Sequence, residues 1–103
     1  MDLKHLVQQE KSEPGLEVFL KEFSEDRLKE YQDLLEATQQ GQWDAVHQIF
    51  HKWKGVCRPY GYLYLGELSE DILRRLASGE RQFQSDFDLI KRYLNEKAAA
   101  LGE

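Results

Sequence analysis

The chain has 103 residues and a formal net charge of −5 at pH 7. This length suits one small domain, and a hydrophobic content of 41% is enough to build a core, so extensive disorder is not expected. The negative charge argues against a nucleic-acid partner and gives no reason to expect binding to an anionic membrane. We therefore expect a single globular domain over residues 1–103.

Cysteine content and hydropathy favour a cytoplasmic location. The single cysteine, Cys57, cannot form an internal disulfide bond, which fits a reducing compartment. No apolar run approaches the ~18 residues of a membrane-spanning helix. The N-terminal stretch "MDLKHLVQQEK" lacks the apolar centre of a secretory signal peptide.

Helical periodicity begins at the N-terminus. Leu3, Leu6 and Val7 recur at helical spacing and predict a short capping helix within residues 1–12. Pro14 suits the first turn of the next helix, where its missing N–H is not needed.

A long second helix is expected from Pro14 to Gly41, because glycine is the commonest residue just after a helix end. Asp26 and Arg27 interrupt its apolar stripe. The stripe consists of Leu16, Phe19, Leu20, Phe23, Tyr31, Leu34, Leu35 and Thr38.

Three further helices complete the expected fold. The third runs from about Trp43 to about Pro59, and Gly61 completes the break. The stripe of the fourth, which stops at the "SGE" of residues 78–80, is Leu63, Leu65, Leu68, Ile72, Leu73 and Leu76. The stripe of the fifth, which starts near Phe83 or at the "SDFD" of residues 85–88, is Phe83, Phe87, Ile90, Leu94 and Leu101.

Short connections between helices of similar length make neighbours antiparallel. We therefore predict an all-α fold: an up-and-down antiparallel four-helix bundle over residues 14–101, with residues 1–12 as the N-terminal cap. Nothing in the sequence demands a dimer, so a monomer is expected. The initiating methionine and the complete bundle pattern suggest a chain that stands alone.

The third helix divides cleanly on a helical wheel. Its apolar arc contains Val46, Ile49, Phe50, Trp53, Val56, Cys57 and Tyr60. Its polar side contains Asp44, His47, Gln48, His51, Lys52, Lys54, Gly55 and Arg58. His51 lies nearly opposite the centre of the apolar arc, so its imidazole is expected to face solvent.

Gly55 lies one turn beyond His51 and about 40° round the helix from it. A glycine inside a helix costs about 0.5–1 kcal/mol relative to alanine. On the polar side, this cost is explained if the missing side chain leaves room for a partner protein to press against the imidazole.

Lys54 fits the same chemistry. It lies about 60° round the helix from His51, close enough to reach a group attached to the ring. An exposed histidine, with a reference pKa of about 6.5, is mostly neutral at pH 7 and offers a nitrogen lone pair as a nucleophile. A phosphoryl group on that nitrogen would receive charge-assisted contacts from Lys54.

The stretch "HKWKGVCRPYG" resembles the signature of the histidine-containing phosphotransfer (HPt) domain family, which is His, two residues, Lys-Gly, five residues, Gly. The matching residues are His51, Lys54, Gly55 and Gly61. The preceding run "LLEATQQGQWDAVHQIFHKWKG" is similar to the lead-in of the family. Leu65, Leu68 and Ile72 are similar to the aliphatic stripe that usually follows. The resemblance covers about residues 16–101.

The resemblance implies a four-helix bundle that relays a phosphoryl group between receiver-domain aspartates in multistep two-component signalling. His51 would accept the phosphoryl group, normally on Nε2. Lys54 would stabilise it, Gly55 would give access, and Gly61 would close the helix. The docking surface would include His47, Gln48, Lys52 and Arg58.

The implied partners are response-regulator receiver domains, a hybrid sensor histidine kinase, or both. The receiver would supply the aspartate and the Mg²⁺ ion. The protein itself would bind no ATP, need no cofactor and have no autokinase activity, so we expect a phosphoryl carrier rather than an enzyme.

Several positions depart from the family pattern. Arg58 and Pro59 stand where small or polar residues are typical, and Phe50 precedes the histidine where alanine is common. Tyr60 and Tyr62 add bulk on both sides of the glycine. These departures leave the chemistry intact and affect the far end of the docking surface, and therefore the identity of the partner.

His47 and His51 have the spacing of a two-ligand metal site, but no glutamate adjoins the first histidine and no cysteine lies on that face, so no physiological metal site is expected. Cys57 lies on the apolar arc and is expected in the core. The alternative function is a helical adaptor or inhibitor that binds a receiver or kinase without phosphotransfer. The presence of both His51 and Lys54 argues against it.

Overall fold

The computed structural model describes residues 2–102, which form α-helices and one short 3₁₀ helix. The elements are α1 (Leu3–Gln9), η1 (Glu17–Phe19), α2 (Leu20–Gln39), α3 (Trp43–Val56), α4 (Leu63–Ala77) and α5 (Gln84–Ala100). The predicted all-α fold, a helical bundle with a short N-terminal helix, is confirmed.

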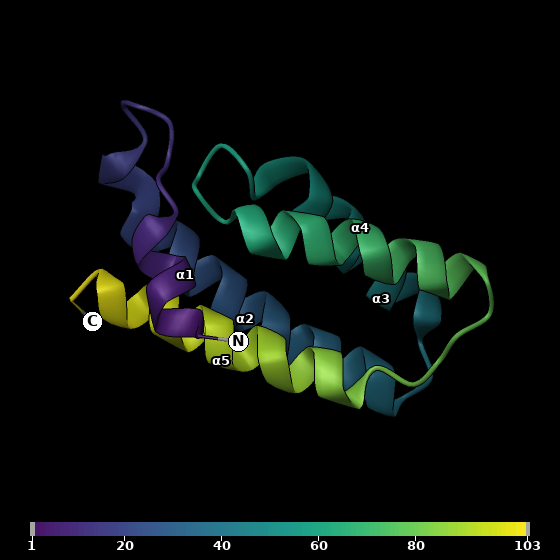
Figure 1. Ribbon diagram of the computed structural model, residues 1–103. Coiled ribbons are helices and arrows are strands. Elements are labelled where there is room, and N and C mark those ends of the chain that lie inside the picture. The colour runs from purple at the N-terminus through teal and green to yellow at the C-terminus, as the bar shows by residue number, and fades with distance from the viewer. Residues whose placement is uncertain (1, 103) are drawn as a thin grey trace.

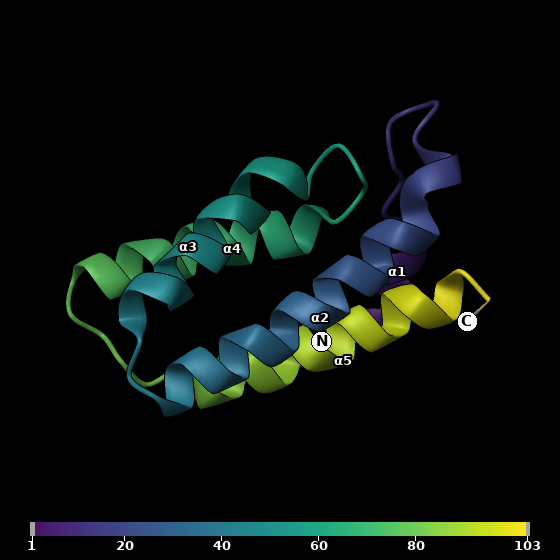
Figure 2. The ribbon, with the colours of Figure 1, turned by 180° about the vertical axis from the view of Figure 1, so that it is seen from behind.

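The four long helices run up and down in two pairs (Figures 1 and 2). Helix α2 lies beside α5, α3 lies beside α4, and α2 also packs against α3. Helix α1 packs against α5. Because neighbours alternate in direction, the start of α2, the end of α3, the start of α4 and the end of α5 share one end of the bundle.

Apolar side chains from all five α-helices form the core. On α3, Val46, Phe50 and Trp53 are fully buried. The buried apolar residues of the other helices are Leu3, Val7, Phe23, Tyr31, Leu34, Ala37, Leu65, Ile72, Leu76, Phe87, Ile90, Tyr93 and Leu94. Each large apolar side chain that is fully buried contributes about 1.5–3 kcal/mol, so this core is the main source of stability.

The predicted start of the second helix was wrong. Pro14 and Gly15 form a turn, and the α-helix begins only at Leu20, after η1. Gly15 has a φ of +92°, and its N–H donates to the Glu17 carboxylate at 2.8 Å. A left-handed residue cannot continue a right-handed helix, so the chain turns before α2 starts.

Three residues predicted in the core stripes are exposed instead: Phe19 (49%), Leu63 (43%) and Leu101 (38%). Phe19 precedes the first residue of α2, Leu63 is the first residue of α4, and Leu101 follows the last residue of α5. All three therefore lie at the ends of the packed helices, where the apolar period no longer determines burial.

The other helix boundaries agree closely with the sequence pattern. Helix α3 ends at Val56, three residues before the expected Pro59, because a turn already begins at Cys57. Helix α4 ends at Ala77, directly before the "SGE" stretch, as predicted. Helix α5 begins at Gln84, so its start lies next to Phe83.

Arg27 does not break α2, although it interrupts the apolar stripe. Its side chain is buried, with Nε 2.6 Å from Glu30 Oε1 and the guanidinium 4.2 Å from the centre of the Phe23 ring. The ion pair and the aromatic face compensate the buried charge, so the helix continues without interruption.

The segment of residues 10–13 crosses the turn between α3 and α4. The backbone N–H of Glu13 donates to the Pro59 carbonyl at 2.8 Å. Gly61 has a φ of +83°, and a Cβ atom there would lie 2.7 Å from the Lys11 carbonyl carbon and the Ser12 nitrogen. Gly61 therefore permits both the left-handed turn and the close passage of this segment.

A buried ion pair fastens the same segment to α5. Lys97 Nζ lies 2.7 Å from Glu10 Oε1 and donates to the Gly61 carbonyl at 2.7 Å. Glu10 also accepts from the Tyr64 N–H at 2.8 Å and from the Tyr93 hydroxyl at 2.5 Å. Glu10 thus supplies a hydrogen-bond acceptor to the first turn of α4. Through these contacts it joins the N-terminal segment to α4 and α5.

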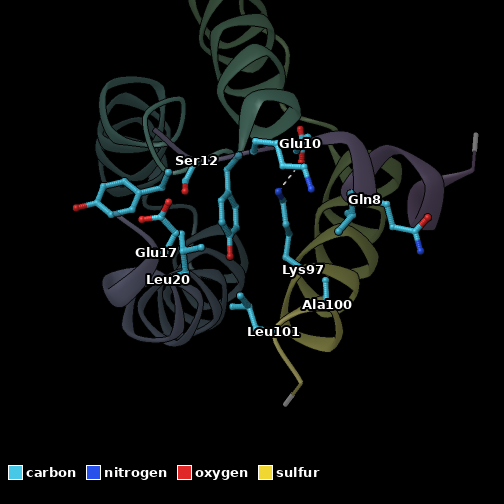
Figure 3. A pocket seen from close by; sticks show the side chains of 12 residues that line it. Gln8, Glu10, Ser12, Glu17, Leu20, Lys97, Ala100 and Leu101 are labelled. Carbon is cyan, nitrogen blue, oxygen red and sulfur yellow. Dashed lines mark ion pairs between the residues drawn. The ribbon is translucent and has the colours of Figure 1, made fainter. Parts of the chain in front are cut away.

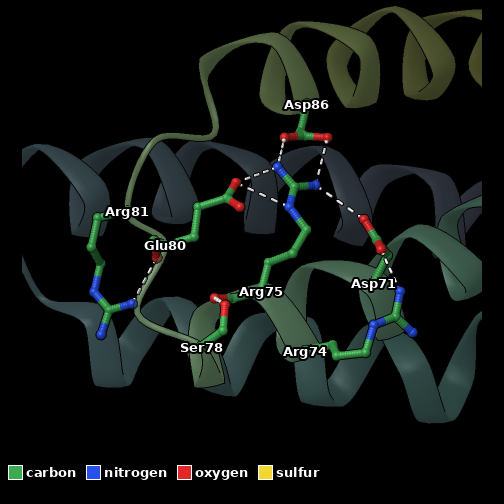
Figure 4. Close-up of polar contacts among 7 residues, drawn as sticks. All are labelled: Asp71, Arg74, Arg75, Ser78, Glu80, Arg81 and Asp86. Carbon is green, nitrogen blue, oxygen red and sulfur yellow. Dashed lines mark hydrogen bonds and ion pairs between the residues drawn. The ribbon is translucent and has the colours of Figure 1, made fainter.

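At the opposite end of the bundle, Arg75 joins α4 to the first turn of α5 (Figure 4). Its Nη2 lies 2.5 Å from Glu80 and 2.8 Å from Asp86, and its Nη1 lies 3.0 Å from Asp71. The guanidinium also lies 5.0 Å from the centre of the Phe83 ring. This cluster fixes the connection between the two helices.

Candidate functional site

Helix α3 presents one polar face to solvent, as the helical wheel predicted. The eight residues placed on that face are all exposed: Asp44, His47, Gln48, His51, Lys52, Lys54, Gly55 and Arg58. The opposite arc is buried or half-buried: Val46, Ile49, Phe50, Trp53, Val56, Cys57 and Tyr60. The packing of α3 between α2 and α4 therefore leaves the His51 side of the helix open.

The imidazole of His51 has an aromatic neighbour on its own helix. The ring of His47 lies nearly parallel to it, with ring centroids 6.1 Å apart and an interplanar angle of 17°. Both side chains are exposed, so the pair lies on the surface rather than in the core. The His51 ring is accessible from solvent.

The three cations around His51 differ in their partners. Lys52 Nζ lies 2.5 Å from Glu30 Oε2 on α2, and Arg58 Nη1 lies 2.8 Å from Glu70 Oε1 on α4. Among residues 2–102, no hydrogen bond or ion pair engages the ammonium of Lys54. Lys54 is therefore the cation on this face that is free to meet an anionic group on His51.

Glu30 of α2 contacts two residues of α3, Lys52 and Trp53. Its Oε1 accepts from the Trp53 indole N–H at 2.9 Å and from Arg27, and its Oε2 accepts from Lys52. Burial alone would raise the pKa of Glu30. The hydrogen bonds from Lys52 and Trp53, with the charges of Arg27 and Lys52, outweigh burial and hold this pKa below its usual value of 4.5.

Sequence reasoning missed Glu30. The available signal was a pair of opposite charges, Arg27 and Glu30, three residues apart and close to the apolar stripe of α2. Charged residues are rarely buried unless they are paired, so opposite charges at this spacing were compatible with a buried ion pair. Its position opposite α3 is a tertiary relationship that the local pattern does not contain.

Close packing does not explain Gly55. A Cβ atom built at Gly55 would have nothing within 4 Å, and its φ is not positive. Neither a tight contact nor a special backbone conformation therefore requires glycine there. What the missing side chain does provide is open space one turn beyond His51.

The bulky residues that depart from the family pattern pack inward. Phe50 is fully buried, with its ring centroid 5.3 Å from that of Trp53. Tyr60 stacks on Phe23 of α2 at 4.2 Å, and Tyr62 meets the same ring edge-on at 4.9 Å. These side chains fill the interface between α2 and the end of α3, so they add no bulk around His51.

One pocket lies away from the candidate residues. It has a volume of about 480 Å³ and lies between the N-terminal segment, the ends of α2 and α5 that meet there, and the turn after α3 (Figure 3). Its wall contains Lys97 and Glu10, which form an ion pair with each other. A smaller hollow of about 280 Å³ borders His47, and Trp43, Leu76 and Arg81 help to line it.

Other expectations concern metal, membrane and thiol chemistry. Across residues 2–102, no group of three or more His, Cys, Asp or Glu side chains is arranged to hold a metal ion. None of the described helices is both long and apolar enough to cross a membrane. Cys57 is fully buried, and burial raises its pKa to about 12, in keeping with its predicted place in the core.

The site thus consists of an exposed imidazole, an ammonium that is unpaired among residues 2–102, and an open helix surface, contributed by His51, Lys54 and Gly55 on one face of α3. Its chemical interpretation rests on this arrangement together with the sequence motif. Comparisons with protein-family models, with curated proteins and with solved structures found no match to this chain.

Proposed function

We propose that this protein is a phosphoryl carrier in a multistep phosphorelay. His51 takes a phosphoryl group from the phosphorylated aspartate of one receiver domain and passes it to the aspartate of another. The observation that carries the proposal is the exposed His51 imidazole, with the open surface at Gly55 and, three residues on, a Lys54 ammonium that has no ion-pair partner within residues 2–102. The resemblance to HPt domains supports the same reading.

The chemistry needs little from the protein beyond presentation of the ring. The Nε2 lone pair of neutral His51 forms a bond to phosphorus while the bond from phosphorus to the aspartyl oxygen breaks. The electron pair of the broken bond leaves with the aspartate carboxylate. The proton on Nδ1 stays on the ring, and the return transfer runs through the same steps in reverse.

Lys54 and Gly55 have distinct roles in this proposal. The Lys54 ammonium makes charge-assisted contacts with the phosphoryl oxygens once the group is on His51. Gly55 leaves space for the receiver to bring its aspartate to the ring. The receiver contributes the aspartate and its Mg²⁺, so this chain acts as a carrier without autokinase activity.

The receiver would dock on the exposed face of α3. His47, Gln48 and Lys52 surround His51 on that face, and Arg58 lies in the turn that follows α3. All four would line the interface. The surface of a helix bundle, rather than a pocket, is suited to a protein partner that delivers a reacting side chain. Most of the energy for substrate positioning would then come from protein–protein contacts.

Incubation with phosphorylated receiver domains tests the proposal. The chain should acquire a label that is labile in acid and stable in base, as expected for phosphohistidine. A His47→Gln variant, which loses the other histidine of the same face, should still be labelled, and a His51→Gln variant should not.

Two results would contradict this proposal. Label that persists in His51→Gln would remove His51 from the mechanism. Tight receiver binding without any label would favour the adaptor or inhibitor instead.

A further inference from the structure

We propose that Arg58 is a positioning residue for Lys54: by pairing with Glu70 on α4, it keeps that carboxylate from capturing the Lys54 ammonium. The inference rests on the proposed phosphoryl transfer at His51. In this role Arg58 keeps the Lys54 ammonium free of Glu70 and does not need to contact the partner protein.

The geometry places one carboxylate beside two cations. Lys54 lies in the last turn of α3, Arg58 follows four residues later in the turn after that helix, and α4 packs along α3. Arg58 Nη1 lies 2.8 Å from Glu70 Oε1. The hydrogen bond and charge of Arg58 lower the pKa of Glu70, and the charges of Lys54 and Arg74 add to this effect. Lys54 is therefore within electrostatic reach of Glu70 but is not its partner.

The path of the Arg58 side chain along α4 depends on a glycine. Gly66 is buried, and a Cβ atom there would lie 3.2 Å from Arg58 Cγ, 3.7 Å from Nε and 3.9 Å from Cζ. The Arg58 stem thus lies directly over the α4 backbone at Gly66, one turn before Glu70. Because no side chain stands at that position, the guanidinium can reach Glu70 along the helix surface.

Stability does not explain this arrangement. The side chains of Arg58 and Glu70 are 44% and 42% exposed, and ion pairs with that exposure contribute little to folding. The other charged groups nearby are Glu67, which acts on Arg58, and Arg74, which pairs with Asp71. Without Arg58, the charge of Lys54 still acts on Glu70. An ammonium engaged by a carboxylate is less available to a phosphoryl group.

Phosphohistidine lifetime tests the inference without interference from docking. The protein is phosphorylated by a receiver domain and separated from it, and the half-life of the phosphoryl group on His51 is then measured. Arg58→Ala should shorten the half-life by about twofold to fivefold, the range open to a charge interaction at an exposed site. Glu70→Gln in the same chain should restore the wild-type half-life, and Arg58→Lys should retain it.

The outcomes separate the two proposals. A wild-type chain that accepts no phosphoryl group overturns the proposed function and this inference with it. A wild-type chain labelled on His51, with the same half-life in Arg58→Ala, overturns the positioning role alone. A shortened half-life that Glu70→Gln fails to restore also overturns it, since Arg58 would then act by another route.

Discussion

Lys52, the residue after His51, is held by Glu30 of the neighbouring helix α2, with Nζ 2.5 Å from Oε2. The same carboxylate accepts the Trp53 indole N–H and pairs with the buried Arg27. One side chain of α2 thus fixes two consecutive residues of α3 directly after the candidate phosphoryl acceptor. Glu30 is therefore expected to matter for the stability of the α2–α3 interface.

Replacement of Glu30 by glutamine should destabilise the fold by about 2–3 kcal/mol at pH 7, because it leaves the buried Arg27 without a counter-charge. The pKa of Glu30 is lowered in the fold, so its stabilisation is fully present above pH 4.5. It is lost as the pH falls below that value, through the lowered pKa. The difference between wild type and Glu30→Gln in urea unfolding should therefore shrink under acid conditions. A difference that stays constant with pH would contradict the assignment, and Glu36→Gln, at an exposed position of α2, serves as the control.

Lys54→Ala should lower the rate of phosphoryl acceptance by roughly fivefold to tenfold, the loss expected for one charge-assisted contact. The fold should not change, because Lys54 is exposed and makes no ion pair among residues 2–102. Stopped-flow or quench-flow transfer from a phosphorylated receiver measures the rate. Lys91→Ala, at an exposed lysine of α5, is the matched control. Equal rates in the two variants would count against the role of Lys54.

Gly55 allows stability and binding to be separated. Gly55→Ala should raise the free energy of unfolding by about 0.5–1 kcal/mol, because alanine favours the helix and its Cβ meets nothing within 4 Å. Gly55→Gln should keep the helix content and weaken receiver binding by about tenfold or more, which corresponds to about 1.4 kcal/mol. Circular dichroism and titration calorimetry measure the two effects. Undiminished binding by Gly55→Gln would refute the access role.

Gly61 should be the glycine least tolerant of substitution. Gly61→Ala should lower the free energy of unfolding for two reasons. Alanine is strained at a positive φ, and the new Cβ would lie 2.7 Å from backbone atoms of Lys11 and Ser12. Gly41 also has a positive φ, +69°, but its Cβ position is open, so Gly41→Ala isolates the conformational cost of about 1–2 kcal/mol. Denaturant unfolding should show a clearly larger loss for Gly61→Ala. Equal losses of stability in the two variants would mean that residues 11 and 12 move away from the new Cβ at little energetic cost, which would contradict this prediction.

The polar face of α3 could be predicted from the sequence because helical periodicity alone determines which side of a helix faces solvent. Val46, Phe50 and Trp53 recur at spacings of four and three, so the helix can bury only one arc. His51 and Gly55 then have to lie on the other side. The turn at Gly41 could be predicted for a similarly local reason, because glycine adopts a positive φ at low cost.

The remaining features depend on contacts between distant parts of the chain. Glu10 pairs with Lys97, which is far away in sequence, and no local pattern links the two. Pro14 looked like a helix start because its φ is compatible with one, but Gly15 turns the chain instead. The partners of Lys52 and Arg58 on α2 and α4 likewise follow from helix packing and not from periodicity.

Direct location of the phosphoryl group tests the central claim most sharply. After incubation with a phosphorylated receiver, the protein is digested at alkaline pH and its peptides are sequenced by mass spectrometry. The account predicts a phosphoryl group on the imidazole of His51 and an unmodified His47. A modified His47 with an unmodified His51, or an unmodified chain recovered from a stable receiver complex, would contradict it.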